Sequence, residues 1–288
     1  MRLPKLIDNS FALYCISAIN SSLQSLLLRI TSLRQPPTCR FTMQVPEYIE
    51  RRIRRPIPPD SCVVDCSTPV VSFGDAHTAT VATLGLNPSR VEFLDRNGNE
   101  LIGPNRRLAT LTSLGASDLT NAPLESVAEV LSDCNSYFER NPYRQWFDQL
   151  ELILDACGVS YYNGSACHLD LVQWATDPTW GSLRPPALRN RLISADSRFL
   201  VEQLSNENIR LLLVNGMGVI RQLQSTAHAS LDELKPIVGL SRQNTRIFMG
   251  MIVDRVRVIA WSTNLQSSFG VTTELRNEIA RRAAELVD

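Results

Sequence analysis

The sequence predicts an α/β protein: a three-layer α/β/α domain around a central sheet of four strands, mostly parallel. Short apolar runs typical of buried strands alternate with longer segments in which apolar residues recur at helical spacing. This alternation favours parallel strands joined by helical crossovers. The chain has 288 residues, of which 44% are hydrophobic, so it can bury the core of one large domain.

The four expected strands are apolar segments that end in polar residues or turns. They cover residues 78–85, 165–172, 209–214 and 255–261. The third is apolar throughout, as expected for a strand that is buried on both faces of a sheet. We expect residues 86–135 to be irregular, because turn signals occur at Asn97-Gly98 and Gly103-Pro104.

Three helices are expected between and after these strands. The first has Asn141 as its N-cap and Gly158 just beyond its end. The second is indicated by apolar residues at helical spacing over residues 188–204. The last is expected to begin at a cap formed by Thr272 or Thr273.

The first 42 residues differ in composition from the rest. The apolar stretch 11–30 is interrupted by asparagine, serine and glutamine, so it is too polar to span a bilayer, and no signal-peptide cleavage site follows it. Met43 is an equally suitable start. We therefore expect residues 1–42 to be an extension outside the fold, residues 43–75 to form an N-terminal arm, and residues 76–288 to form the main domain.

The charge and cysteine content exclude some classes of function. Lys+Arg and Asp+Glu both number 29, so the formal net charge is zero. This balance excludes a strongly polybasic binder but permits a local patch for phosphate. The seven cysteines are scattered, which is typical of reduced thiols in a cytoplasmic protein. The one close pair, Cys62 and Cys66, has no second pair or nearby His, so we expect no metal and no cofactor.

The first expected strand ends in an amide followed by a proline. Pro88 removes a backbone donor and keeps Asn87 out of helical geometry. The strand therefore has a stiff exit with an amide side chain at its carboxyl end, where ligands bind in α/β sheets. A simple turn is the alternative interpretation, since Asn-Pro is common in turns.

Polar signatures occur at the ends of all four expected strands. They are Gly85-Leu86-Asn87-Pro88-Ser89, Cys167-His168-Leu169-Asp170-Leu171-Val172-Gln173, Val214-Asn215-Gly216-Met217-Gly218 and Trp261-Ser262-Thr263-Asn264-Leu265. Their order and spacing resemble the uracil-DNA glycosylase superfamily, over roughly residues 78–288. The resemblance implies an enzyme with a four-stranded α/β/α fold that flips a base out of DNA and hydrolyses its glycosidic bond.

By this resemblance, Asn87 positions the attacking water. An amide cannot act as a strong general base, but its carbonyl oxygen can orient water while the oxocarbenium-like sugar forms. Ser89 stands where the uracil enzymes have a Tyr that blocks substituents on pyrimidine C5, and a small serine leaves room there. Ser89 can also be a turn or N-cap residue, and the two roles are compatible.

The resemblance places Asp170 where the family commonly has an Asn that reads the base edge. An ionised Asp only accepts hydrogen bonds, so it matches the N4 amine of cytosine, and a protonated Asp could also donate to cytosine N3. His168 shares its strand face with Asp170 and can hydrogen-bond nearby. The alternatives are a structural role for His168 and a loop-capping role for Asp170.

The last signature stands where relatives have His-Pro-Ser-Pro-Leu. In relatives the His stabilises the departing base, and the Leu fills the space that the flipped base leaves in the stack. Here Leu265 is the expected wedge, and Ser262, Thr263 or Asn264 would have to supply the donors of the missing His. Phe93 is the candidate for stacking on the base.

Contact with DNA phosphates has to come from local clusters of arginine. The clusters are Arg51-Arg52-Ile53-Arg54-Arg55, Arg106-Arg107, and Arg184 with Arg189 and Arg191. Of these residues, Arg184 is the one that we expect to contact DNA. The alternative is that each cluster is an ordinary solvated face.

Together these residues predict a monofunctional DNA glycosylase that acts as a cytoplasmic monomer without metal, cofactor or membrane. Asp170 and Ser89 favour a C5-substituted cytosine of bacteriophage DNA as the substrate, so that the abasic sites left behind would serve antiviral defence. One alternative is a repair glycosylase for uracil or a damaged base. The other is a module that binds modified DNA without catalysis, which the missing His permits.

Overall fold

The computed structural model of the protein describes residues 44–227, 229–240, 244–266 and 270–287. Residues 44–288 form one compact unit by their internal contacts. The expected arm is part of this unit from residue 44 onward, because helix α2 (Glu47–Ile53) contacts α3 (Leu124–Asn135) and α5 (Pro186–Asn206). The prediction about residues 1–42 lies outside the described residues.

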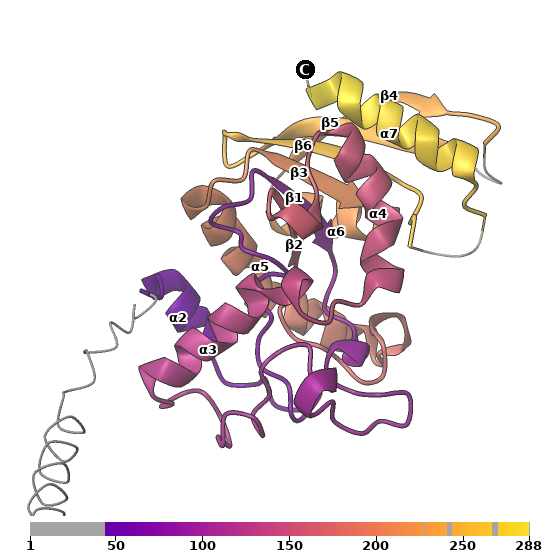
Figure 1. Ribbon diagram of the computed structural model, residues 1–288. Helices are drawn as coiled ribbons and strands as arrows, with labels where there is room; N and C mark the ends of the chain where they lie inside the picture. Colours follow the sequence, from indigo (N-terminus) through magenta and orange to yellow (C-terminus); the bar gives the residue numbers. More distant parts are fainter. Residues whose placement is uncertain (1–43, 228, 241–243, 267–269, 288) are drawn as a thin grey trace, which may run out of the picture. The chain divides into compact units, whose positions relative to one another are not determined.

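The described residues form an α/β structure with one mixed sheet of six strands in the order β2-β1-β3-β6-β5-β4 (Figure 1). The four predicted strands are present and parallel: β1 (Val81–Gly85), β2 (Ala166–Asp170), β3 (Leu211–Asn215) and β6 (Val256–Trp261). The prediction of a four-stranded sheet is wrong, because two further strands, β4 (Ser230–Ile237) and β5 (Thr245–Ile252), extend it as an antiparallel hairpin.

The hairpin is missing from the prediction because β4 has no apolar run. Its sequence, Ser-Leu-Asp-Glu-Leu-Lys-Pro-Ile, is largely exposed, and Ile237 is its one buried residue. In β5, Gly250 interrupts the apolar pattern, and a Cβ at that position would lie 2.0 Å from the carbonyl oxygen of Ser230. The close approach of the two strands therefore requires glycine there.

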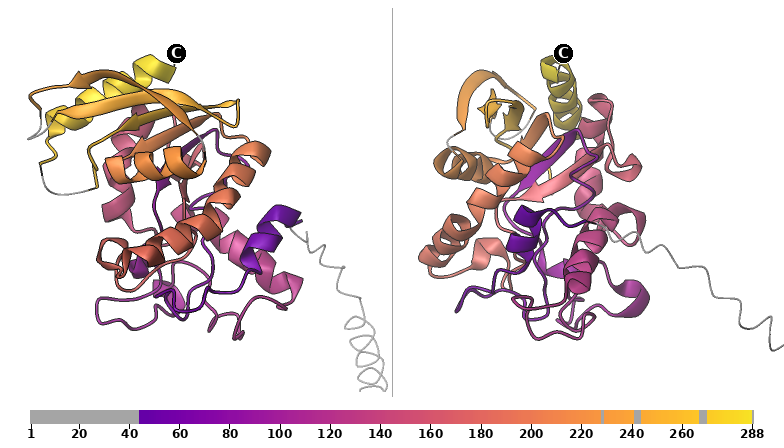
Figure 2. Two further views of the ribbon diagram at one scale, coloured as in Figure 1. Left: turned by 180° about the vertical axis from the view of Figure 1, so that it is seen from behind. Right: turned by 90° about the vertical axis from the view of Figure 1, so that its left-hand side faces the viewer.

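Helices cover both faces of the sheet. Helices α4 (Arg144–Ala156) and α7 (Thr273–Val287) pack against each other on one face, and α5 and α6 (Met217–Thr226) lie on the other (Figures 1 and 2). Successive strand residues point to opposite faces. Leu213 accordingly belongs to the hydrophobic core under α4 and α7, whereas Leu212 belongs to the core under α5 and α6.

One helix start and one additional helix differ from the prediction, and the cap of the last helix agrees with it. Helix α4 begins at Arg144 rather than at Pro142, and Asn141 is not its cap, because the Asn141 side chain donates to the Asn105 carbonyl instead. Helix α3 lies within the segment that we expected to be irregular. The cap of α7 is confirmed: the Thr272 hydroxyl accepts a hydrogen bond from the Leu275 amide.

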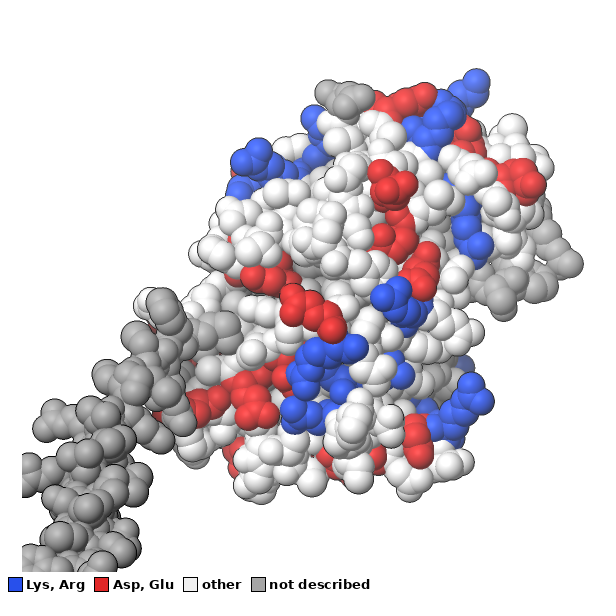
Figure 3. Space-filling view, viewed as in Figure 1, with Lys and Arg blue, Asp and Glu red and all other residues white. Residues whose placement is uncertain are grey.

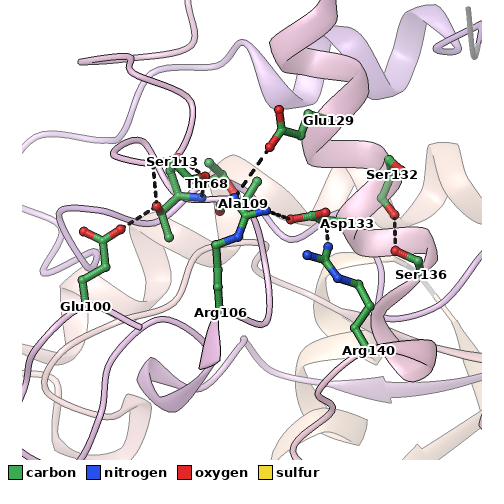
Figure 4. A network of polar contacts seen from close by, with 11 residues as sticks. Thr68, Glu100, Arg106, Ala109, Ser113, Glu129, Ser132, Asp133, Ser136 and Arg140 are labelled. Atoms are coloured by element: carbon green, nitrogen blue, oxygen red, sulfur yellow. Dashed lines mark hydrogen bonds and ion pairs between the residues drawn. The ribbon is translucent and has the colours of Figure 1, made fainter. Parts of the chain in front are cut away.

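Ion pairs join α3 to Arg106 in the loop before it and to Arg140 in the turn after it. Asp133 on α3 accepts from Arg140 and pairs with Arg106 at 3.4 Å, and Arg106 also reaches Glu129 at 3.6 Å (Figure 4). Apolar residues of α3 face the core at helical spacing, so the signal for this helix was present in the sequence. Among the described helices, none is long and apolar enough to cross a bilayer.

Candidate active site

A cavity of about 440 Å³ opens at the carboxyl ends of the parallel strands. Its wall comes from the ends of β1, β2 and β3 and from the segments that follow them, joined by α4. This is the edge at which α/β sheets bind ligands. The predicted site residues that line it are Asn87, Ser89, His168, Asp170 and Asn264.

The amide of Asn87 is held in one orientation. Its Nδ2 donates to the carbonyl oxygen of Pro88 at 3.0 Å, to that of Trp174 at 3.1 Å and to the Thr176 hydroxyl at 3.3 Å. Because all three partners are acceptors here, they identify the nitrogen end of the amide. No hydrogen bond from the described residues reaches Oδ1, which leaves this oxygen available to a ligand or water at the cavity wall.

Ser89 has both of the roles considered for it. Its hydroxyl accepts from the Val91 amide at 3.5 Å and so caps the short 3₁₀ helix Arg90–Glu92. The same residue lines the cavity. The wall at this point is therefore a small side chain rather than a ring.

His168 and Asp170 lie side by side on the buried end of β2. The His168 Nε2 is 3.5 Å from the Asp170 Oδ1, and its Nδ1 is 2.7 Å from the Thr83 hydroxyl, which meets the Tyr161 hydroxyl at 2.5 Å. Asp170 is 4% exposed, and its Oδ2 is buried with no hydrogen-bond partner among the described residues. A buried acceptor without a donor is costly, so Asp170 favours a ligand that brings an N–H or O–H group.

Gly85 makes the space that this pair occupies. It lies opposite Asp170 in the parallel register of β1 and β2. A Cβ on Gly85 would lie 2.3 Å from the Asp170 Oδ1 and 2.8 Å from the His168 Nε2. The glycine of the strand-end signature is therefore required by the position of the Asp170 carboxylate.

Glu92 also lines the cavity, although it was not among the predicted site residues. It is 2% exposed, and its Oε2 accepts a hydrogen bond from the Tyr137 hydroxyl at 2.6 Å. Burial raises the pKa of Glu92 to about 7, and the charge of Asp170 adds to this effect, while Tyr137 and Arg107 oppose it. A carboxyl group that titrates near neutral pH in a cavity is typical of a functional site.

The aromatic side chains at the cavity are not the one that we predicted. Phe93 is fully buried and lies outside the lining, so its assignment as the stacking residue is wrong. Phe73, Phe147, Trp146 and Trp180 line the cavity instead. The Phe147 ring packs edge-on against His168, with centroids 5.4 Å apart.

The segment after β6 differs from the prediction at three residues. Leu265 is 0% exposed and packs in the core, so it is not an accessible wedge. Ser262 accepts from the Arg246 amide, Thr263 pairs with the Thr245 hydroxyl, and neither lines the cavity. Of the predicted residues in this segment, Asn264 lines the cavity, and Gln266, which was not predicted, lines it as well.

These two side chains are oriented by the end of β3. The Asn215 Nδ2 donates to Asn264 Oδ1 at 2.9 Å and to Gln266 Oε1 at 3.0 Å. The Asn215 Oδ1 accepts from the Trp261 indole at 2.8 Å and from the Leu265 amide at 3.0 Å. Asn215 therefore links the end of β3 to the segment that follows β6 at the cavity wall.

Most charges of the Arg51–Arg55 cluster are used within the fold. Arg52 and Arg55 both pair with Asp196 at 3.0 Å, Arg54 pairs with Glu50 at 2.7 Å, and Arg51 pairs with Glu202 at 3.1 Å. Blue and red groups are interspersed on the face that Figure 3 shows. Arg184 is exposed and donates to the Gly181 and Leu183 carbonyls, so its contact with DNA stays a prediction.

A buried ionic network of Arg52, Asp196 and Gln173 is hydrogen-bonded to the backbone of Asp170. The Asp196 carboxylate accepts a hydrogen bond from the Arg52 guanidinium at 3.0 Å and another from the backbone amide of Gln173 at 3.1 Å. Arg52 also donates to the Gln173 side chain at 2.9 Å, and the Gln173 Nε2 donates to the Asp170 carbonyl at 2.6 Å. The guanidinium lies 4.9 Å from the Trp174 ring centroid. The Trp174 carbonyl accepts a hydrogen bond from Asn87, so the network is connected both to Asp170 and to Asn87 in the cavity wall.

No protein-family model matches the chain, and no curated protein matches its sequence significantly. Within the described ranges, no group of three His, Cys, Asp or Glu residues lies close enough together to hold a metal ion. The fold and the cavity define an α/β protein with an amide, two carboxyl groups and aromatic rings gathered at the carboxyl ends of its parallel strands.

Proposed function

We propose that this protein is a DNA glycosylase that excises a cytosine carrying a substituent on C5. The observation that carries the proposal is the pairing of two groups in one cavity. Asn87 offers a fixed carbonyl oxygen, and Asp170 offers an unsatisfied carboxylate. The first suits the positioning of water, and the second suits the reading of an amine.

The chemistry assigned to Asn87 is orientation rather than strong base catalysis. Cleavage of the glycosidic bond develops positive charge on the sugar, so a water held at the correct position can attack without being fully deprotonated first. The three acceptors around Nδ2 prevent the amide from turning, so Oδ1 is already in place when the base enters. A group that is fixed before reaction loses no free energy to reorganisation.

The cavity is compatible with a flipped, substituted base. Its volume of about 440 Å³ lies within the range of about 300–1,000 Å³ found for small-molecule sites. The more accessible Trp146 and Trp180 rings offer surfaces for stacking, and Ser89 leaves space where a larger side chain would exclude a C5 group. Substituted cytosines of this kind occur in bacteriophage DNA, which gives the proposed enzyme a role in antiviral defence.

The direct test is to incubate the protein with DNAs that carry cytosine, uracil or a series of C5-substituted cytosines. Free base is identified by mass spectrometry, and abasic sites are detected by cleavage of the strand with alkali. Release of a substituted cytosine supports the proposal. A shift of DNA mobility without base release would instead identify a binding module, and release of uracil alone would identify a repair enzyme.

Asp170→Asn is expected to shift the preferred base from cytosine towards uracil by about tenfold or more. Cytosine presents a donor at N4 and an acceptor at N3, whereas uracil presents an acceptor at O4 and a donor at N3. An Asn amide can turn to match uracil, while the Asp carboxylate repels its O4. Competitive release from matched oligonucleotides measures the ratio. An unchanged ratio in a folded variant would remove Asp170 from the base-reading position.

Gly85→Ala is expected to lower the rate of base release by about a hundredfold through a displacement of Asp170. The new methyl group would overlap the Asp170 carboxylate, which can rotate away, so the fold should tolerate the change better than the site does. Activity and melting temperature are measured together. Gly181→Ala, at a cavity position where an added Cβ meets nothing within 4 Å, is the control. Equal activity of the two variants would contradict the assignment.

A further inference from the structure

We propose that Glu92 is a second base-reading residue: as the neutral acid, it donates a hydrogen bond to an acceptor on the base edge whose amine is bound by Asp170. This inference rests on the proposed function and adds to it the second half of the recognition. The base edge that fits an acceptor beside a donor is an amine next to an unprotonated ring nitrogen, as in cytosine.

Glu92 is a buried residue of the cavity wall. It lies on the 3₁₀ turn that follows Asn87-Pro88, it lines the cavity, and it is 2% exposed. The Tyr137 hydroxyl donates to Oε2 at 2.6 Å, and the Tyr143 amide in turn donates to the Tyr137 oxygen at 2.9 Å. These two bonds assign the Glu92 Oε2 as the acceptor end of the carboxyl group. No hydrogen bond from the described residues reaches Oε1.

The protonation state of Glu92 depends on its burial and on the charge of Asp170. The negative charge of Asp170 raises the pKa of Glu92, because a like charge nearby disfavours ionisation of the carboxyl group. Burial is the main cause that raises the pKa of Glu92 to about 7, so a large share of the molecules carry the neutral acid near neutral pH. Burial also raises the pKa of Tyr137 well above its usual value, so its phenol keeps the proton that it donates.

The charged and titratable groups around Glu92 are few. Tyr137 contacts it from the turn after α3, Arg107 acts from the irregular segment, and Asp170 acts from β2 with His168 beside it. The Arg107 guanidinium donates to the Asn141 carbonyl and lies over the Tyr143 ring, without an ion pair to Glu92. Glu92 therefore has no direct cationic partner among the described residues that would hold it ionised.

The division of roles between the two carboxyl groups follows from their partners. Asp170 has a buried oxygen that lacks a donor, so it needs a donor from the ligand. Glu92 already receives a hydrogen bond at Oε2, so as an acid its remaining oxygen carries a proton for the ligand. An acceptor next to a donor matches cytosine, and it mismatches uracil and thymine at both positions.

The test measures DNA binding rather than cleavage, in an Asn87→Ala background, so that it applies whether or not the bond is hydrolysed. The probes are oligonucleotides with 5-hydroxymethylcytosine or thymine at one position, at about pH 5.5 and about pH 8.5, on either side of the pKa of Glu92. We expect affinity for the 5-hydroxymethylcytosine probe to fall about tenfold at the higher pH, because Glu92 loses the donated proton.

Two substitutions separate the donor from the charge. Glu92→Gln keeps a donor at every pH, so it should bind as well as the parent at low pH and lose the pH dependence. Glu92→Leu removes the donor, so it should bind weakly at both pH values. Glu100→Gln is the matched control, because that carboxylate binds Thr110 and Thr112 outside the cavity.

The outcomes distinguish this inference from the proposed function. A preference for 5-hydroxymethylcytosine over thymine that does not vary with pH, or a Glu92→Gln variant that binds as weakly as Glu92→Leu, would overturn the role of Glu92 alone. Absence of any preference between the two probes would overturn the proposed cytosine recognition together with it. The Gln variant and the parent pH profile decide the question even where the Leu variant does not fold.

Discussion

Replacement of Asn87 with alanine is expected to lower the rate of base release by about a hundredfold or more. The variant removes the oxygen that we propose orients water, and with it the three hydrogen bonds that Nδ2 makes. Asn87 is partly exposed at the cavity wall, so its truncation opens no core cavity, and the melting temperature should change little. Single-turnover base release and thermal unfolding are the two measurements.

Asn87→Asp is a sharper version of the same experiment. A carboxylate would turn one of its oxygens towards the three acceptors that now receive Nδ2, and it has no proton to offer them when ionised. We therefore expect Asp to be no better than Ala here. Asn97→Ala, in an exposed turn, is the control. Retention of more than about a tenth of the activity by Asn87→Ala would remove Asn87 from the mechanism.

Asp196→Ala is expected to lower the free energy of unfolding by about 3–5 kcal/mol, which is the usual effect of breaking a buried ion pair on one side. Arg52 is 2% exposed, and Asp196 offsets part of the lowering of its pKa by burial, so removal of Asp196 would leave the buried guanidinium without its partner. Arg55 would lose the same carboxylate. Denaturant unfolding at equilibrium measures the change.

The matched comparison replaces both members of the pair. Arg52→Met with Asp196→Leu removes both charges, so this double variant should be more stable than Asp196→Ala. Glu285→Ala breaks an exposed pair with Arg281 and should change the free energy of unfolding by less than about 1 kcal/mol. If Asp196→Ala is no less stable than Glu285→Ala, the buried network does not stabilise the fold around the site.

The sequence predicted those parts of the site whose position depends on parallel strand ends. Asn87 and Asp170 follow apolar runs in β1 and β2, and parallel pairing brings such ends to the same edge. Leu265 and Phe93 could not be placed in this way. Each is an apolar residue beyond a strand end, and only the tertiary structure shows that both belong to the hydrophobic core that also includes residues of α4 and α7.

Glu92 was missed because its local pattern indicates something else. Ser89 followed three residues later by Glu92 is the pattern of a capping box, in which the glutamate bonds back to the start of a helix. The structure keeps the serine cap but turns the carboxylate inward to Tyr137, which is 45 residues away in the sequence. Only the three-dimensional arrangement brings the two together.

The two outer strands of the sheet, β2 and β4, differ in what their outer edges offer to another chain. On one side, Phe73 pairs with His168 of β2 through both of its backbone groups. On the other, β4 carries Asp232, Glu233, Lys235 and Pro236 in succession around one apolar residue. Charges and proline on an outer strand oppose the addition of a further strand from a neighbouring molecule. The polar composition that hid β4 from an apolar pattern thus also makes this strand a poor partner for the sheet of a second molecule.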